Sequence, residues 1–169
     1  MSINRERTAD LADCAEFGRL LLARKMQVCL AESCTGGWLA QTLTSVPGSS
    51  SWFGFGFVAY ADAAKVALLG VSPELIKEFG AVSESVASAM LLGALSTSNA
   101  DMGISITGIA GPAGGSLAKP VGTVYIACGN AADNVCQRFQ FNADRTGVRR
   151  AAADAALVLG MEWLRKTTV

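Results

Sequence analysis

The sequence predicts a single α/β domain: a three-layer α/β/α sandwich around a mixed, mainly parallel sheet. Short apolar segments alternate with segments whose apolar residues recur every three or four positions, which is typical of strands joined by helices. Two strand-like segments then follow one another late in the chain, which indicates an antiparallel pair. The chain has 169 residues, 51% of them hydrophobic, so we expect one domain with a sizeable core.

The helices are predicted from their apolar period and from their first residues. The opening helix carries Leu11, Cys14, Phe17, Gly18, Leu21 and Leu22 on one face. Ser72 before Pro73 is an N-cap with proline at the first helical position, and Ser83 caps the helix that follows. In that helix we expect six residues to face inward: Val86, Ala87, Met90, Leu91, Ala94 and Leu95. The predicted helices cover residues 11–25, 38–46, 62–69, 73–79, 83–95 and 144–163.

The strands are predicted from short apolar, β-branched or aromatic runs between turn residues. Within the aromatic run 52–60, Gly54 and Gly56 indicate a bulge or a close backbone approach. Residues 121–128 and 135–141 are expected to form a hairpin. The predicted strands cover residues 27–31, 52–60, 102–106, 121–128 and 135–141.

The charge balance and the absence of histidine exclude several functions. The chain has 14 Lys plus Arg residues and 14 Asp plus Glu residues. It therefore has no excess positive charge of the kind that favours binding to nucleic acid or to an anionic membrane. The chain has no histidine, so Ser–His–Asp and Cys–His nucleophiles and histidine-ligated zinc are excluded. If the protein is an enzyme, its base must be a lysine, a carboxylate, a tyrosine or a cysteine.

The five cysteines indicate a reducing compartment. Their number is odd and none form a CxxC pair, so we expect reduced thiols in a cytoplasmic protein and no metal site. The first twenty residues are charged and helical in pattern, so we expect no signal peptide. No apolar run approaches the length that spans a bilayer, so we expect no membrane association. High apolar content with few charges favours a homo-oligomer.

Three constellations could carry chemistry. The run Glu32-Ser33-Cys34-Thr35-Gly36-Gly37 leads from a buried strand into a helix amino terminus, where free N–H groups favour an anion; alternatively, Ser33 is only a cap.

In the second constellation, Tyr60 and Lys65 lie five residues apart after a strand. Desolvation disfavours the charged form of a lysine, and such an amine can deprotonate a serine, although a solvated surface lysine is the simpler interpretation.

The third constellation is the glycine-rich loop after residue 106. Its spacing matches neither a phosphate-binding Walker loop nor a dinucleotide fingerprint, although its amides could contact a phosphate. Downstream, Arg145 could clamp a phosphate with two hydrogen bonds, or pair with a neighbour on an exposed helix face.

Together these segments resemble the CinA carboxy-terminal domain family of nicotinamide-nucleotide amidases. The resemblance covers nearly the whole chain in order, and residues 1–169 are expected to form one such domain. It is carried by Ala-Glu-Ser-Cys-Thr-Gly-Gly at 31–37, Gly-Phe-Val-Ala-Tyr at 56–60 with Lys65, Gly-Ala-Val-Ser at 80–83, Ile-Thr-Gly-Ile-Ala-Gly-Pro at 106–112 and Lys-Pro-Val-Gly-Thr-Val at 119–124.

The resemblance implies hydrolysis of nicotinamide mononucleotide to nicotinic acid mononucleotide and ammonia, with no metal or organic cofactor. It implies Ser33 as the nucleophile, Lys65 as its base and Tyr60 as a supporting hydroxyl. The implied substrate-binding residues are Thr35, Gly36, Gly37, Thr107, Gly108 and Arg145. The run Tyr60-Ala61-Asp62 differs from the Tyr-Ser-Asn of many members and puts a carboxylate near Lys65.

Two alternatives stay open on the sequence. Glu32, Lys65 and Cys34 offer the residue types of an amidase with a cysteine nucleophile, although adjacent residues at a strand end usually point in opposite directions. A non-catalytic module that binds a nucleotide phosphate would keep the glycine loops and Arg145 but would not need a basic Lys65. Asp62 is the feature that most favours this second alternative.

Overall fold

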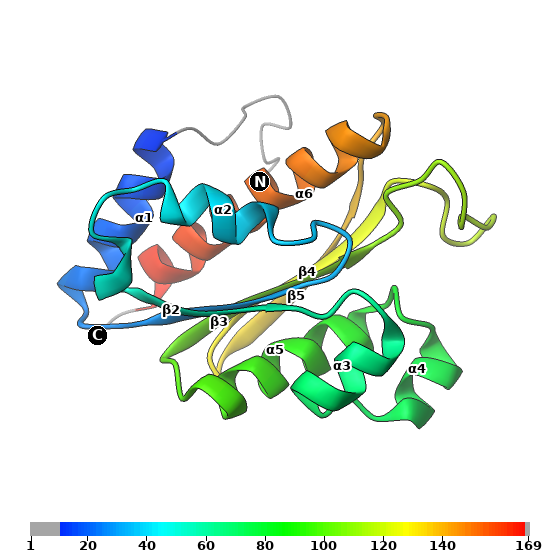
Figure 1. The fold of residues 1–169 in the computed structure, drawn as a ribbon, viewed down its shortest axis with the longest axis horizontal. Helices are drawn as coiled ribbons and strands as arrows, with labels where there is room; N and C mark the ends of the chain where they lie inside the picture. Colours follow the sequence, from blue (N-terminus) through cyan, green and yellow to red (C-terminus); the bar gives the residue numbers. More distant parts are fainter. Residues whose placement is uncertain (1–10, 168–169) are drawn as a thin grey trace.

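The computed structural model describes residues 11–167, which form three layers with a sheet between two layers of helices (Figure 1). Helices α1, α2 and α6 cover one face of the sheet and helices α3, α4 and α5 cover the other. The helices are α1 (Leu11–Ala23), α2 (Trp38–Thr44), α3 (Asp62–Leu69), α4 (Pro73–Phe79), α5 (Glu84–Ser98) and α6 (Arg145–Lys166), with a 3₁₀ turn η1 (Ser49–Ser51). The strands are β1 (Val28–Glu32), β2 (Phe53–Val58), β3 (Met102–Gly108), β4 (Thr123–Gly129) and β5 (Asn134–Gln140).

The five strands form one mixed sheet in the order β2-β1-β3-β4-β5. Strands β2, β1 and β3 are parallel, whereas β3 with β4 and β4 with β5 pair antiparallel. The predicted α/β sandwich with a mixed sheet and a late hairpin is therefore confirmed. Because β1 lies between two parallel neighbours, the carboxyl ends of β1, β2 and β3 meet at one edge of the sheet. Open α/β sheets bind their ligands outside this edge.

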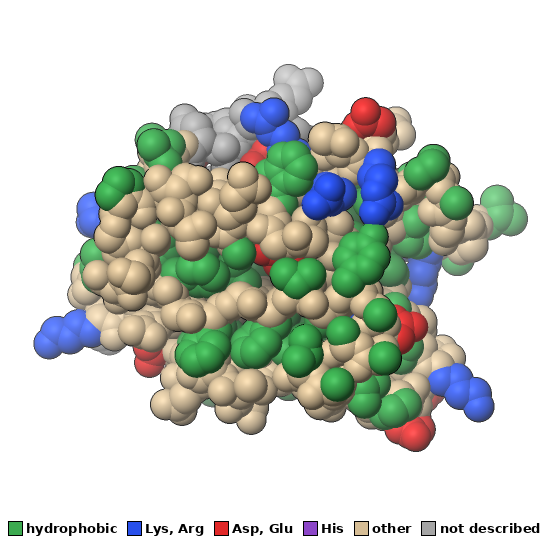
Figure 2. Space-filling model, in the orientation of Figure 1, with side chains coloured by type: hydrophobic (Ala, Val, Ile, Leu, Met, Phe, Trp, Pro, Cys, Tyr) green, Lys and Arg blue, Asp and Glu red, His purple; other side chains and the backbone are tan. Residues whose placement is uncertain are grey.

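Strand β2 is an edge strand with a bulge at Gly54. Val28 of β1 pairs with Phe53, but the next residue, Cys29, pairs with Phe55, so Gly54 is the extra residue. The bulge predicted in this strand is thus confirmed. The outer surface of β2 is apolar, and Phe55 and Val58 are each 48% exposed. In Figure 2 hydrophobic side chains form a row across the middle of this face, between the two helical layers.

The core lies on both faces of the sheet, and most of the predicted inward positions are buried. All six expected residues of α5 are buried. In α1, however, Leu11 and Leu22 are 56% and 51% exposed, so the prediction that they face inward is wrong. The buried stripe of α1 is centred on Phe17 and Leu21 and includes Leu20 rather than Leu22. At about 100° per residue, Leu22 lies about 140° around the helix from Phe17, whereas Leu20 lies only about 60° from it.

The two predicted late strands form the expected hairpin, but β4 starts at Thr123 rather than at residue 121. Gly122 has a φ of +89°, which ends the extended backbone there. A Cβ at this position would lie 1.9 Å from the carbonyl oxygen of Phe141, so only glycine fits the turn. The turn holds the loop between β3 and β4 over the carboxyl edge of the sheet.

Candidate active site

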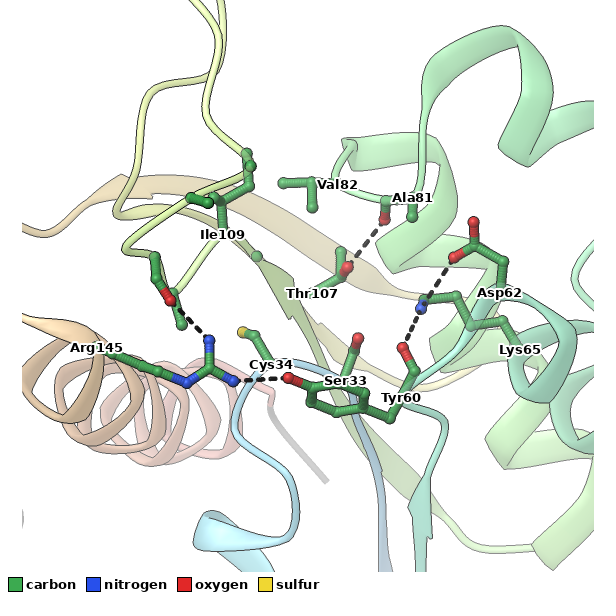
Figure 3. Close-up of a pocket in the computed structure, with 15 residues that line it drawn as sticks. Ser33, Cys34, Tyr60, Asp62, Lys65, Ala81, Val82, Thr107, Ile109 and Arg145 are labelled. Atoms are coloured by element: carbon green, nitrogen blue, oxygen red, sulfur yellow. Dashed lines mark hydrogen bonds and ion pairs between the residues drawn. The ribbon is translucent and has the colours of Figure 1, made fainter.

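A cavity of about 280 Å³ opens at the carboxyl edge of the sheet, above the ends of β1, β2 and β3. It gathers residues from five separate parts of the chain, several of which are labelled in Figure 3. Six of the nine predicted site residues line it: Ser33, Tyr60, Lys65, Thr107, Gly108 and Arg145. The fold therefore brings together a hydroxyl, a phenol, an amine and a guanidinium that lie up to 112 residues apart in sequence (145 − 33).

Ser33 is held at the end of β1 by its backbone. Its amide donates to the carbonyl oxygen of Ile106 in β3 at 2.9 Å, and its own carbonyl accepts from the amide of Gly36 at 3.0 Å. The chain then turns through Gly36 and Gly37, whose φ angles of +61° and +91° favour glycine. The side chain of Ser33 is nearly buried and faces the cavity. The backbone thus fixes this hydroxyl at the base of the site.

Glu32 uses the first N–H groups of α2. Its carboxylate accepts from the amides of Gly37 at 3.0 Å, Leu39 at 3.2 Å and Ala40 at 2.8 Å, and the residue is 1% exposed. These are the donors that a substrate anion would need. Thr35, Gly36 and Gly37 do not line the cavity. The structure therefore does not bring these three predicted substrate-binding residues to Ser33's cavity.

Lys65 is buried although it is a lysine on a short helix. Only 1% of it is exposed, and its Nζ donates to the backbone oxygen of Tyr60 at 3.2 Å and to Oδ1 of Asp62 at 3.4 Å. The Asp62 side chain is 59% exposed, so this ion pair joins a buried cation to a solvated carboxylate. In Figure 3 the hydroxyl of Ser33 lies between the amine of Lys65 and the guanidinium of Arg145.

Arg145 reaches the cavity from the first turn of α6. Asp144 caps this helix, since its Oδ1 accepts from the amide of Gly147 at 2.8 Å. The guanidinium of Arg145 donates to the hydroxyl oxygen of Tyr60 and to the carbonyl oxygen of Gly111, both at 2.7 Å. Figure 2 shows Lys and Arg side chains gathered above this part of the face. A guanidinium has five N–H donors, so Arg145 can hold these partners and still bind an anion.

Thr107 and Gly108 end β3 at the back of the cavity. The hydroxyl of Thr107 donates to the carbonyl oxygen of Ala81 at 2.8 Å, which holds the segment before α5 against the site and leaves the hydroxyl oxygen as an acceptor. At Gly108 a Cβ would lie 2.7 Å from Cγ2 of Val124 and 2.9 Å from the oxygen of Thr123. Glycine is needed there because β4 passes so close.

Cys34 lines the same cavity but is a poor nucleophile. It is 5% exposed, and burial raises the pKa of its thiol to about 11, with the nearby Glu32 carboxylate acting in the same direction. The thiolate is the reactive form, and it is scarce at neutral pH. Glu32 is also already bonded to three amides. The geometry thus favours Ser33 over the Glu32–Lys65–Cys34 alternative.

Sequence reasoning missed two parts of the site. Glu32 was considered only as a member of the cysteine alternative, although its carboxylate caps α2. Arg149 was not identified as a site residue, yet its guanidinium donates to two carbonyl oxygens of the turn after Ser33. No cluster of three or more potential metal ligands occurs among residues 11–167, and none of the helices in that range could cross a membrane.

The fold and the cavity together define an α/β protein with a histidine-free site of hydroxyl, amine and guanidinium groups. The family model of the CinA C-terminal domain matches residues 12–167, and the chain belongs to this family. It is 47% identical over 154 residues to the nicotinamide-nucleotide amidohydrolase PncC of Escherichia coli K12, covering 90% of this chain and 93% of that protein.

Two further comparisons agree. The nicotinamide-nucleotide amidohydrolase PncC of Pseudomonas putida is 49% identical over 150 residues, covering 86% of this chain and 94% of that protein. Among solved structures, the competence damage-inducible protein A of Klebsiella pneumoniae superposes with a TM-score of 0.90 at 34% identity, covering 94% of this chain and 98% of that one. The resemblance inferred from the sequence motifs is therefore confirmed.

Proposed function

We propose that this protein hydrolyses the carboxamide of nicotinamide mononucleotide to nicotinic acid mononucleotide and ammonia, with Ser33 as nucleophile and Lys65 as base. One observation carries the proposal: a serine hydroxyl, a buried lysine amine and an arginine guanidinium line one cavity in a chain without histidine. The relatives are named nicotinamide-nucleotide amidohydrolases, which supports the amide bond of a nicotinamide nucleotide as the target.

In the first half of the reaction, the neutral amine of Lys65 takes the proton of Ser33 Oγ as this oxygen attacks the carboxamide carbon. The carbon–nitrogen bond then breaks. The leaving nitrogen takes the proton back from Lys65 and departs as ammonia, and Ser33 is left as an ester. In the second half, Lys65 takes a proton from water, the resulting oxygen attacks the ester, and nicotinic acid mononucleotide leaves as Ser33 regains its proton.

Arg145 supplies the contact with the 5′-phosphate in this proposal. The amides of α2, which sequence reasoning assigned to the same task, are occupied by Glu32. Tyr60 accepts from Arg145, so its own hydroxyl proton is free to point toward the substrate. Binding energy gained at the phosphate orients the carboxamide at Ser33.

The non-catalytic binding module is the second candidate, and the Asp62–Lys65 contact favours it. A carboxylate oxygen 3.4 Å from Nζ stabilises the ammonium form, which cannot accept a proton. In an amidase this contact must loosen or be outweighed by burial. In a non-catalytic binding module, the Asp62–Lys65 ion pair would be permanent and would only help to shape the cavity.

A coupled ammonia assay separates the two candidates. Nicotinamide mononucleotide, its riboside and NAD are compared in parallel, with and without chelator. We expect ammonia from the mononucleotide, slower release from the riboside because it lacks the phosphate, and no effect of the chelator. Tight binding of the mononucleotide with no ammonia released would replace the amidase by the module.

The setting of this activity is also part of the proposal. All five cysteines are free thiols, which supports a reducing, cytoplasmic compartment. We infer one catalytic domain over residues 1–169, supported by the family match to residues 12–167. The exposed apolar edge strand β2 supports self-association. Charge balance supports a small-molecule nucleotide, rather than a nucleic acid or a membrane, as the partner.

A further inference from the structure

The turn that carries Ser33 is held from outside the cavity by one arginine of α6. Nε of Arg149 donates to the carbonyl oxygen of Cys34 at 3.1 Å, and its Nη2 donates to the carbonyl oxygen of Thr35 at 2.8 Å. Arg149 therefore bonds to the two residues that directly follow the proposed nucleophile. Unlike Arg145, it does not line the cavity.

Three further observations show that the turn is built around this side chain. The guanidinium carbon of Arg149 lies 5.3 Å from the ring centroid of Trp38, the first residue of α2, in a cation–π contact. A Cβ at Gly36 would lie 3.3 Å from Nη2 of Arg149, so the glycine leaves room for the guanidinium as well as adopting a positive φ. Arg149 is half-buried, so both hydrogen bonds are partly shielded from solvent.

Glu32 and Arg149 bind different backbone groups of the turn that follows Ser33. Glu32 binds N–H groups of Gly37, Leu39 and Ala40 and thereby fixes where α2 begins. Arg149 binds carbonyl groups earlier in the turn and thereby fixes the planes of two peptides next to Ser33. A planar guanidinium bonds to two oxygens at defined angles, which an ammonium does not.

We propose that Arg149 is a positioning residue of the catalytic site, which sets the backbone of the Ser33-Cys34-Thr35 turn and so places the Ser33 hydroxyl for attack. The inference rests on the proposed amidase function. Loss of the two bonds removes the side-chain partner of the Cys34 carbonyl and leaves the Thr35 carbonyl with the longer bond from the amide of Trp38, at 3.3 Å, so the peptides next to Ser33 are less constrained. A displacement of about 1 Å of a nucleophile can lower a rate about 100-fold without changing how tightly the substrate binds.

The test compares Arg149→Gln with Arg150→Gln, which removes the same charge from the neighbouring, exposed position of α6. Steady-state kinetics with nicotinamide mononucleotide are measured well below the Tm of each variant. We expect Arg149→Gln to lower kcat by about 30- to 100-fold with KM within about threefold, because the turn moves and the phosphate contact does not. Arg150→Gln should match the wild type.

Alkylation of the cysteines supplies a readout that does not depend on activity. Cys34 lies in the turn, whereas Cys128 lies fully buried in β4 and reports on unfolding of the core. Labelling with N-ethylmaleimide is followed at each site by peptide mass spectrometry. We expect Arg149→Gln to label Cys34 about tenfold faster, through local opening of the turn, with Cys128 unchanged.

The kinetic and labelling results together decide whether Arg149 positions Ser33. An unchanged kcat, a loss confined to KM, unchanged labelling of Cys34, or a parallel rise at Cys34 and Cys128 would each overturn it, the last by showing a general structural role. If the wild type releases no ammonia from the mononucleotide, the proposed function fails, and the labelling alone decides whether Arg149 sets this turn. Should Arg149→Gln not fold, Arg149→Lys carries the same comparison, since its ammonium cannot bond to both carbonyls in one plane.

Discussion

Nη2 of Arg145 donates to the hydroxyl oxygen of Tyr60 at 2.7 Å, which joins the start of α6 to the segment after β2 across the cavity of Ser33. The same guanidinium donates to the carbonyl oxygen of Gly111. Arg145 is therefore fixed in place before any substrate arrives. A guanidinium that is already oriented loses little side-chain entropy on binding a phosphate.

Arg145→Ala should weaken binding of the mononucleotide more than it slows the chemical step. Loss of a charge-assisted contact predicts a rise in KM of about 10- to 100-fold, with kcat within about threefold. The riboside lacks the phosphate, so its KM should change little. Steady-state kinetics on both substrates check this, with Arg150→Ala as the control on the same helix. An equal loss on both substrates would show that Arg145 does not contact the phosphate.

Lys65→Arg should remove most turnover even though the charge at this position is kept. A guanidinium stays protonated at any working pH and cannot accept the proton of Ser33. We expect kcat/KM at pH 7 to fall by at least about 100-fold, the usual contribution of a general base. Lys77→Arg, on the exposed face of α4, is the matched control. Near-normal turnover by Lys65→Arg would exclude this lysine as the base.

The buried thiol of Cys34 predicts a loss of stability in alkaline solution. Burial raises its pKa to about 11 in the folded protein, whereas the ordinary pKa of a cysteine in an unfolded chain is 9.0. The unfolded state therefore loses its proton first, so this contribution to stability is complete below about pH 9 and declines as the pH rises toward 11. The change attributable to Cys34 is on the order of 2 kcal/mol.

Urea unfolding at pH 7, 9 and 10.5 measures this effect. Cys34→Ala is the comparison, because it removes the ionisable group while leaving the other buried cysteines in place. Its free energy of unfolding should fall less steeply with pH than that of the wild type. Identical slopes for the two proteins would show that Cys34 ionises equally in the folded and unfolded states.

Local features of the fold were predictable because their causes lie within a few residues. Ser72 and Ser83 accept hydrogen bonds from the first amides of α4 and α5, as their position before each helix indicates. Gly54 forms the bulge of β2. The order of the strands was not predictable, because it depends on contacts between segments far apart in the sequence.

The site was predictable in its residue types but not in all of its contacts. Ser33, Lys65 and Arg145 were identified and do line one cavity. The direction of the Glu32 side chain was not evident, since a glutamate that ends a strand can point to either face of the sheet. Arg149 bonds to a turn more than a hundred residues earlier, and no sequence spacing reveals such a contact.

In the proposed reaction Ser33, and not its neighbour Cys34, attacks the carboxamide. Ammonia release from nicotinamide mononucleotide by Ser33→Ala and Cys34→Ala, measured side by side with the wild type, tests it most directly. We expect Ser33→Ala to lose at least about 1,000-fold in kcat while still binding the mononucleotide, and Cys34→Ala to stay within about threefold of the wild type. An active Ser33→Ala beside an inactive Cys34→Ala would contradict it.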